Sequence, residues 1–252
     1  MAELEAFREN FYSTAAMLGG NSGGYMSFMP SGSLVAMTGL PYAGENYAIF
    51  NSDATHCEVA EAIDIFAIRN IPFTAPQFPE VGEELAARLE ANRLHVRKNY
   101  TAMVLERGGN YQRASSENTV NAADENSVRD WAETAWRGFG GDDVPESYFA
   151  FASYLFKVRE NALYIYREDG IPAACALLHK SKKACGLYYF ATLPSFRRRG
   201  IATKMLAFLA EEAFAEREFF VLLATEEGLP CYAKFGFRSL SNVPIRSAEE
   251  DI

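Results

Sequence analysis

The stretch GLYYFATLPSFRRRGIAT, Gly186 to Thr203, joins an apolar segment, an arginine-rich turn and the first turn of a helical pattern. Its first half is apolar at consecutive positions, which indicates a strand buried on both faces, and Pro194 ends that strand because proline donates no ladder hydrogen bond. Beyond Gly200, apolar residues recur at helical spacing at Ile201, Met205, Phe208 and Leu209. The stretch therefore predicts a strand, a short turn and a helix that begins at Gly200.

The start of this helix is predicted to bind an anion. The first backbone N–H groups of a helix have no internal acceptor and lie at the positive end of its dipole, and a glycine lets a ligand approach the backbone closely. Arg197, Arg198 and Arg199 add charge-assisted donors for phosphate oxygens. An arginine cluster by itself is more often a solvated surface, so the prediction depends on strand, turn and helix occurring in this order.

The segment TLPSFRRRGIA resembles the acetyl-CoA-binding motif of the GNAT superfamily of N-acetyltransferases, in which a strand ending V-x-P precedes R/Q-x-x-G-x-G/A at the start of a helix. Arg197, Gly200 and Ala202 fill the three defining positions of that motif. The resemblance implies that acetyl-CoA is the co-substrate, with its pantetheine arm paired to the backbone of Phe190, Ala191 and Thr192. It also implies that the pyrophosphate is held by Arg197, Arg198, Arg199, Gly200, Ile201, Ala202 and Thr203.

A second segment agrees with this resemblance. The run FFVLLAT, Phe219 to Thr225, indicates another buried strand, and the YAKFGF that follows resembles the Y-x-x-x-G-F ending of the family. Tyr232 takes the position of the tyrosine whose hydroxyl lies beside the sulfur of acetyl-CoA, which implies that it protonates the departing thiolate. A tyrosine at an arbitrary position more often only packs, and the spacing to Gly236 and Phe237 favours the catalytic role. Thr225 stands where many relatives carry asparagine, so the resemblance does not define how the acceptor amine is bound.

The reaction that this site implies is direct transfer, in which an uncharged amine attacks the thioester carbonyl and no covalent enzyme intermediate forms. Backbone N–H groups near Thr192 would stabilise the oxyanion. A base is needed because most amines are protonated at neutral pH, and Glu226, with Glu227 beside it, is the candidate. Two acids on a loop are more often only solvated. Cys231 is interpreted as a spectator thiol because no histidine stands near it in the sequence.

Composition narrows the alternatives. The chain has 252 residues, a formal net charge of −9 and a pI near 5.0, which disfavours a nucleic-acid binder and suits an amine-bearing acceptor. The four cysteines and three histidines show no metal-ligand spacing, so no metal is predicted. The acidic N-terminus does not resemble a signal peptide, and no apolar run is long enough to span a membrane. We therefore expect a cytoplasmic protein without a membrane partner.

The length and the order of the expected elements predict two GNAT-like domains of mixed α/β (α+β) class, each a mostly antiparallel sheet flanked by helices, at residues 1–107 and 110–252. The first is expected to contain a helix at 4–18, strands at 33–38 and 47–50, a helix at 59–67, a strand at 71–74, a helix at 81–89 and a strand at 95–105. The second is expected to contain a strand at 111–114, helices around 131–136 and 148–156, strands at 163–166, 173–179 and 186–193, the helix from Gly200, a strand at 219–225, a helix at Tyr232 and a strand near Phe237.

The first half is interpreted as a copy that has lost its cofactor site. Its equivalent turn, between Phe50 and Val59, reads NSDATHCE, with no arginine, no glycine and two acids that would repel a pyrophosphate. A single acetyl-CoA site, in the second half, is therefore predicted.

Together these patterns predict an acetyl-CoA-dependent N-acetyltransferase that acts on a primary amine, with a small-molecule acceptor favoured over a protein. Two other interpretations stay open. One is an acetyl-CoA sensor without turnover, against which Tyr232 argues. The other is an interaction protein whose first half receives a partner. Monomer and homodimer are both compatible with the sequence.

Overall fold

The computed structural model describes residues 2–111, 113 and 117–248, and the chain divides into two compact units. Unit 1 comprises Met1–Asn10 and Met103–Leu240, and unit 2 comprises Phe11–Ala102 and Ser241–Ile252. Helix α1 (Ala2–Gly19) and strands β5 (His95–Glu106) and β11 (Arg238–Ser247) therefore contribute residues to both units. The predicted domains, 1–107 and 110–252, stay a prediction. The compact units group the chain differently: unit 1 includes the N-terminal segment Met1–Asn10, and unit 2 includes the C-terminal segment Ser241–Ile252.

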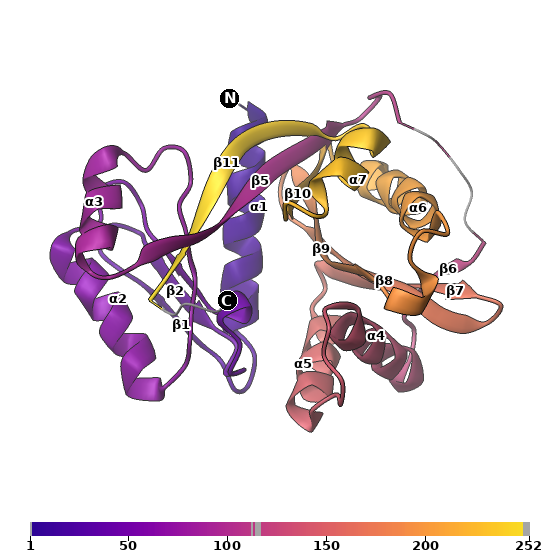
Figure 1. The fold of residues 1–252 in the computed structure, drawn as a ribbon, viewed down its shortest axis with the longest axis horizontal. Helices are drawn as coiled ribbons and strands as arrows, with labels where there is room; N and C mark the ends of the chain where they lie inside the picture. Colours follow the sequence, from indigo (N-terminus) through magenta and orange to yellow (C-terminus); the bar gives the residue numbers. More distant parts are fainter. Residues whose placement is uncertain (1, 112, 114–116, 249–252) are drawn as a thin grey trace. The chain divides into compact units, whose positions relative to one another are not determined.

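Unit 1 is built on a mixed, mostly antiparallel sheet (Figure 1). Strands β6 (Thr119–Asn121), β7 (Asn161–Glu168), β8 (Ile171–Lys180) and β9 (Ala184–Thr192) are antiparallel neighbours, whereas β10 (Phe219–Ala224) runs parallel to β9. Parallel neighbours need a crossover connection, which helix α6 (Ile201–Glu216) supplies after the short 3₁₀ turn η2 (Pro194–Phe196). The predicted order of strand, turn and helix at the start of this crossover is confirmed.

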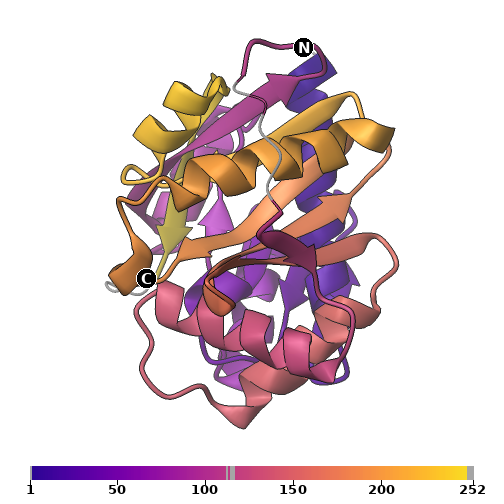
Figure 2. The same ribbon diagram turned by 90° about the vertical axis from the view of Figure 1, so that its right-hand side faces the viewer.

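Helices cover both faces of this sheet. Helices α4 (Glu125–Gly138) and α5 (Glu146–Lys157) lie on one face, and α6 lies on the other with α7 (Leu229–Phe235) beside it (Figures 1 and 2). The core on the α6 side is apolar, and its buried side chains include Leu178, Leu187, Met205, Leu209 and Phe220. Burial of each such side chain stabilises the fold by about 1.5–3 kcal/mol, so this core fixes α6 on the strands that precede and follow it.

Unit 2 contains a three-stranded antiparallel sheet of β1 (Tyr25–Phe28), β2 (Leu34–Met37) and β3 (Tyr47–Ile49), the last preceded by the 3₁₀ turn η1 (Ala43–Glu45). The two-residue strand β4 (Ala75–Pro76) pairs with the end of β11. Helices α2 (His56–Arg69) and α3 (Glu83–Ala91) close the core, which buries Val35, Val59, Phe66, Leu85 and Leu89. Their apolar residues recur at helical spacing, as the sequence predicts.

One predicted strand of unit 2 is wrong. Residues 71–74 form only a single bridge, between Thr74 and Tyr47. The two backbone hydrogen bonds of this bridge run from the Thr74 N–H to the Asn46 carbonyl at 2.9 Å and from the Ala48 N–H to the Thr74 carbonyl at 3.0 Å. Before the bridge, the Asn46 side chain takes the place of a ladder donor, because its Nδ2 donates to the carbonyl of Pro72 at 2.9 Å. These contacts hold the segment as an irregular connection to β4. Strand β1 was not predicted; half of its residues face outward, with the Phe28 side chain 56% exposed.

The predicted strand at 111–114 lies partly outside the described residues, which omit 112 and 114. Tyr111 and Arg113 do not belong to a strand. The Tyr111 ring instead packs against Phe214 and Phe235, with ring centroids 5.8 and 5.6 Å apart. None of the helices in the described part of the chain has the length and apolar character needed to cross a membrane.

Candidate functional site

Strand β9 changes its pairing halfway along its length. Its pairing with β10 runs from Ala184 opposite Phe219 to Leu187 opposite Leu222, and ends there. On the β8 side the register shifts, so that β9 carries one residue more than β8, a β-bulge. The bulge residue Tyr189 has a φ of 49°, which is unusual for a residue other than glycine. Strands β9 and β10 therefore separate beyond Leu187.

This separation leaves one edge of the β9 backbone available. Ala191 and Thr192 still pair with β8, opposite Cys175 and Ala174. Their other edge faces the side from which β10 has diverged. An extended ligand can pair with such an edge as an additional strand does. The segment of Phe190, Ala191 and Thr192 is thus placed as the predicted pantetheine contact requires.

Side chains from helix α4 and strand β8 satisfy the backbone groups that the bulge leaves without ladder partners. The indole N–H of Trp131 donates to the carbonyl of Ala176 at 2.8 Å, and the thiol of Cys175 donates to the carbonyl of Tyr189 at 3.3 Å. The Trp131 ring also meets the Tyr189 ring edge-on, with centroids 5.5 Å apart. A buried carbonyl left unpaired costs about 1–3 kcal/mol, so these contacts stabilise the bulge. Sequence reasoning missed them, because strand register decides which carbonyl loses its partner.

The turn between β9 and α6 has the geometry of an anion site. Arg198 and Gly200 both have left-handed backbones, with φ of 63° and 76°. Alternation of this kind points successive N–H groups into one concavity. No side chain caps α6 at Gly200, and its first turn contains no acid. A Cβ placed on Gly200 would meet no atom within 4 Å, so the approach to the helix start is open.

The three arginines of the turn differ in what they contact. Arg197 donates through Nε to the carbonyl of Thr192 at 3.0 Å and through Nη2 to the carbonyl of Gly138 at 2.9 Å. The Arg199 guanidinium lies over the Phe196 ring, 5.1 Å from its centroid. All three arginines are exposed. The structure thus brings the predicted phosphate-binding residues to one turn, but it commits the Arg197 side chain to backbone carbonyls.

Tyr232 lies on α7, close to the segment where β9 and β10 separate. Its ring is 6.1 Å from that of Phe190 and 5.9 Å from that of Phe237, measured between centroids. Within the described part of the chain its hydroxyl has no hydrogen-bond partner. Burial raises the pKa of Tyr232 well above the usual tyrosine value, so the phenol stays protonated at neutral pH. The hydroxyl is therefore an available proton donor beside the separated strands.

The segment between β10 and α7 carries the predicted base. Thr225 accepts a hydrogen bond from the Gly228 N–H through its hydroxyl at 3.1 Å and one from the Leu229 N–H through its carbonyl at 2.9 Å, which closes the turn. Glu226 is exposed and forms no hydrogen bond or ion pair with any residue that the structure describes. Cys231 is half-buried, and burial raises the pKa of its thiol. A neutral thiol is a poor nucleophile, which favours the spectator interpretation.

In unit 2, the start of α2, at the turn predicted to correspond to the one before α6, is capped by one of the chain's own carboxylates. Glu58, on the first turn of α2, accepts from the backbone N–H of Thr55 at 2.7 Å and of Ser31 at 2.8 Å. The Thr55 hydroxyl in turn accepts from the Glu58 N–H, which completes a capping box. These backbone hydrogen bonds lower the pKa of Glu58 from 4.5 to about 2. The T-x-x-E pattern at residues 55–58 is visible in the sequence and would have found this cap.

Replacement of Glu58 by glutamine is expected to destabilise unit 2 by about 1.5–3 kcal/mol at about pH 7, the usual contribution of hydrogen bonds to a charged group. Because the pKa of Glu58 is lowered on folding, its contribution is present above 4.5 and is lost as the pH falls toward 2. The difference between Glu58→Gln and the parent protein should therefore shrink on acidification. Urea unfolding followed by amide exchange of Ser31 and Thr55 measures it. Glu61→Gln, exposed on the same helix, is the control, and equal loss in both variants would contradict the assignment.

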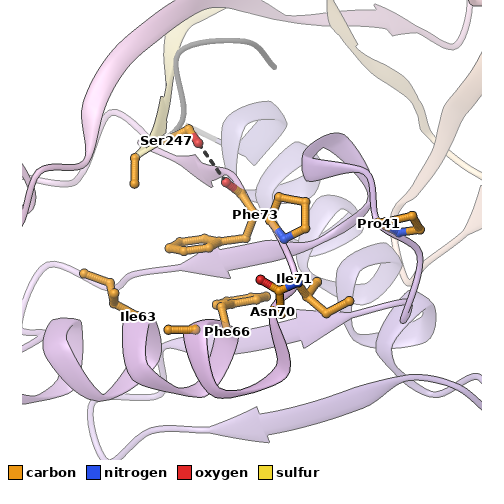
Figure 3. Close-up of a pocket in the computed structure, with 10 residues that line it drawn as sticks. Pro41, Ile63, Phe66, Asn70, Ile71, Phe73 and Ser247 are labelled. Carbon is orange, nitrogen blue, oxygen red and sulfur yellow. Dashed lines mark hydrogen bonds between the residues drawn. The ribbon is translucent and has the colours of Figure 1, made fainter.

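A pocket in unit 2 does not suit the cofactor. Its volume is about 430 Å³, and its walls include Ile63, Phe66, Ile71 and Phe73 (Figure 3). The rings of Phe66 and Phe73 are stacked, with centroids 4.1 Å apart. None of the ten lining residues is charged, and none is a predicted site residue. The pocket therefore lacks groups that would hold a pyrophosphate. Within the described residues, no cluster of His, Cys, Asp and Glu has the arrangement of a metal site.

Comparison with known proteins agrees with this geometry. Residues 126–237 match the model of the acetyltransferase (GNAT) family. This range contains the separation of β9 and β10, the turn before α6 and Tyr232. Among curated proteins, none matches the sequence.

Solved structures with a similar fold cover most of the chain. A GCN5-related N-acetyltransferase from Kribbella flavida aligns with a TM-score of 0.73 and 13% identity, over 97% of this chain and 95% of its own. A GCN5-related N-acetyltransferase from Sphaerobacter thermophilus aligns with a TM-score of 0.63 and 11% identity, over 100% and 91%. A tandem GNAT protein from the clavulanic acid biosynthesis pathway aligns with a TM-score of 0.57 and 12% identity, over 86% and 78%. The predicted α/β fold with two GNAT-like halves is confirmed.

Proposed function

We propose that this protein is an N-acetyltransferase that transfers the acetyl group of acetyl-CoA directly to a primary amine, at a site in unit 1. The observation that carries the proposal is the combination of separated strands and an open helix start: β9 and β10 stop pairing at Leu187, and α6 begins at Gly200 without a side-chain cap. The match of residues 126–237 to the acetyltransferase (GNAT) family model supports the same class of reaction.

Acetyl-CoA would be held at two points of the chain. The backbone edge of Phe190, Ala191 and Thr192 would pair with the amides of pantetheine. The N–H groups from Arg198 to Thr203 would donate to the pyrophosphate, where the dipole of α6 adds about 0.3–1 kcal/mol per charge. The side chains of Arg198 and Arg199 add charge-assisted donors. With acetyl-CoA held in this way, the thioester would lie at the bulge, close to Tyr232.

The chemistry follows from this placement. The uncharged amine attacks the thioester carbonyl, and backbone N–H groups near Thr192 stabilise the oxyanion that forms. Collapse of the tetrahedral intermediate expels the thiolate of CoA, which takes the proton of the Tyr232 hydroxyl. The proton lost by the amine goes to a base, for which we propose Glu226, directly or through water. Tyr232 then regains its proton from solvent.

A single site per chain is part of the proposal. We propose that the two GNAT-like halves correspond to domains near 1–107 and 110–252 and that the first is degenerate. The Glu58 carboxylate supports this, because it already accepts the N–H groups of Thr55 and Ser31 at the start of α2. A phosphate brought to that position would meet a like charge. The acidic net charge of −9 is compatible with an amine acceptor, and we propose a small cytoplasmic one.

Calorimetric titration with acetyl-CoA, followed by an amine screen that detects the released thiol, tests the proposed function. We expect one acetyl-CoA bound per chain and turnover with at least one class of amine. Binding without turnover by any amine would favour the alternative, a sensor of acetyl-CoA. Absence of binding, or two bound molecules per chain, would contradict the proposed single site.

At a pH below the pKa of the amine, replacement of Glu226 by glutamine is expected to lower kcat about a hundredfold or more, since the general base is removed. Affinity for acetyl-CoA should not change. Glu227→Gln is the matched control, because it removes the neighbouring exposed carboxylate. The dependence of kcat on pH for the three proteins is the measurement. Equal effects of the two substitutions would show that neither carboxylate is the specific base.

A further inference from the structure

We infer that Arg197 is a positioning residue, which fixes the end of α4 to the opened segment of β9, and that its guanidinium does not bind the phosphates of acetyl-CoA. The motif position alone suggests a phosphate ligand. The structure instead directs two of its donors to carbonyls, Nε to Thr192 at 3.0 Å and Nη2 to Gly138 at 2.9 Å. The backbone N–H of Arg197 also donates, to the carbonyl of Pro194 at 3.3 Å. For its effect on acetyl-CoA affinity, the inference rests on the proposed function.

The two carbonyls belong to elements that must stay in register. Gly138 is the last residue of α4, where helix carbonyls have no internal donor. Thr192 is the last residue of β9 and the last of the three residues proposed to pair with pantetheine. A guanidinium is planar and carries donors in a fixed fork, so one arginine can hold both carbonyls, whereas a lysine ammonium is a point donor. Arg197 therefore connects α4, β9 and the phosphate turn through one side chain.

The packing beside this contact requires the same close approach. A Cβ placed on Gly138 would lie 2.6 Å from the Cβ of Ala191, closer than real Cβ contacts. The end of α4 is thus packed directly on the opened segment of β9. About two helical turns before Gly138, Trp131 donates to the carbonyl of Ala176 opposite the bulge. Helix α4 consequently supports β9 at the bulge through Trp131 and at its end through Gly138 and Arg197.

The two possible roles of Arg197, support of β9 and binding of phosphate, differ in how salt should change the affinity for acetyl-CoA. An exposed arginine that binds phosphate acts through a charge–charge attraction, which salt screens over about 3 Å at 1 M ionic strength. Arg197 donates to neutral carbonyls, so loss of its side chain displaces β9 to an extent that salt does not restore. The two roles can therefore be separated by the salt dependence of the affinity.

The chain contains an internal reporter for α4. It has two tryptophans, Trp131 and Trp136, and both lie on this helix. Their fluorescence and its quenching by acrylamide report on the packing of α4 without any ligand. A change in quenching in the ligand-free protein tests the positioning role even if acetyl-CoA is not bound, so failure of this inference and failure of the proposed function remain distinguishable.

The experiment compares Arg197→Ala with Arg198→Ala and Arg199→Ala. For Arg197→Ala we expect affinity for acetyl-CoA to fall about fivefold to tenfold at both about 0.1 M and about 1 M salt, the effect of one or two hydrogen bonds. Tryptophan quenching should rise, and millimolar methylguanidinium should restore both properties in part. For the two control variants, the loss of affinity should shrink at high salt and quenching should not change.

Gly138→Ala provides a second variant in case Arg197→Ala folds poorly. It leaves every charge in place but forces α4 away from Ala191, and should reproduce the salt-independent loss and the increased quenching. Arg197→Lys should recover only part of the affinity, since one ammonium replaces the fork. A loss in Arg197→Ala that disappears at high salt with unchanged quenching would overturn the inference and assign the guanidinium to phosphate.

Discussion

Replacement of Tyr232 by phenylalanine is expected to lower kcat about a hundredfold or more, the range that general acid catalysis contributes. Affinity for acetyl-CoA should stay within about twofold, because the ring contacts with Phe190 and Phe237 need no hydroxyl. Stability should also be kept, since within the described residues nothing hydrogen-bonds that hydroxyl. Thiol release under saturating substrates and calorimetric titration measure the two quantities.

The pH dependence sharpens this expectation. Burial raises the pKa of Tyr232, so its hydroxyl keeps its proton through neutral and mildly alkaline pH. The ratio of kcat in the parent protein to kcat in Tyr232→Phe should therefore be constant from about pH 6 to pH 9. The decline of kcat at acidic pH should result from protonation of the amine and of its base. Tyr111→Phe, which removes a hydroxyl bonded to Glu211, is the control and should leave kcat unchanged. If Tyr232→Phe has the same kcat as the parent protein, Tyr232 is not the general acid.

The sequence was sufficient to predict the elements that present the cofactor site. The consecutive apolar residues before Pro194, the glycine at position 200 and the helical spacing after it each depend on local backbone physics, and the structure reproduces them as β9, η2 and α6. Tyr232 was placed by its spacing to Gly236, where α7 ends with a φ of 127°. Local patterns of this kind survive in the fold because few long-range contacts compete with them.

What the sequence did not predict depends on pairing between distant segments. The bulge at Tyr189 exists only in relation to β8, and the use of Trp131 to satisfy Ala176 requires α4 to lie across both strands. Likewise, Arg197 fits the family motif, but its contact with Gly138 spans 59 positions of the chain. Such contacts are set by register and packing, which periodicity does not encode. The same limit explains the wrong strand at 71–74, where Asn46 replaces ladder bonds with side-chain ones.

Replacement of Gly200 by glutamate is expected to abolish measurable binding of acetyl-CoA, a loss of more than about a hundredfold in affinity. Gly200 has a φ of 76° and ψ of 6°, and open space surrounds the position of an added Cβ. Any side chain there costs about 1–2 kcal/mol of left-handed backbone strain. A carboxylate additionally places a negative charge at the start of α6, where a phosphate about 5 Å away would be repelled by about 3 kcal/mol at an effective dielectric constant of about 20.

Gly200→Gln separates these two effects, because glutamine has the same shape and strain but no charge. We expect it to weaken acetyl-CoA binding only about tenfold, and we expect the gap between the glutamate and glutamine variants to narrow at high salt. Titration of both variants at about 0.1 M and about 1 M salt, with thermal unfolding as the check on folding, makes the comparison. Because the only difference between them is a carboxylate at the helix start, tighter or equal binding by Gly200→Glu would mean that the pyrophosphate does not lie there, and the proposed acetyl-CoA site would have to be abandoned.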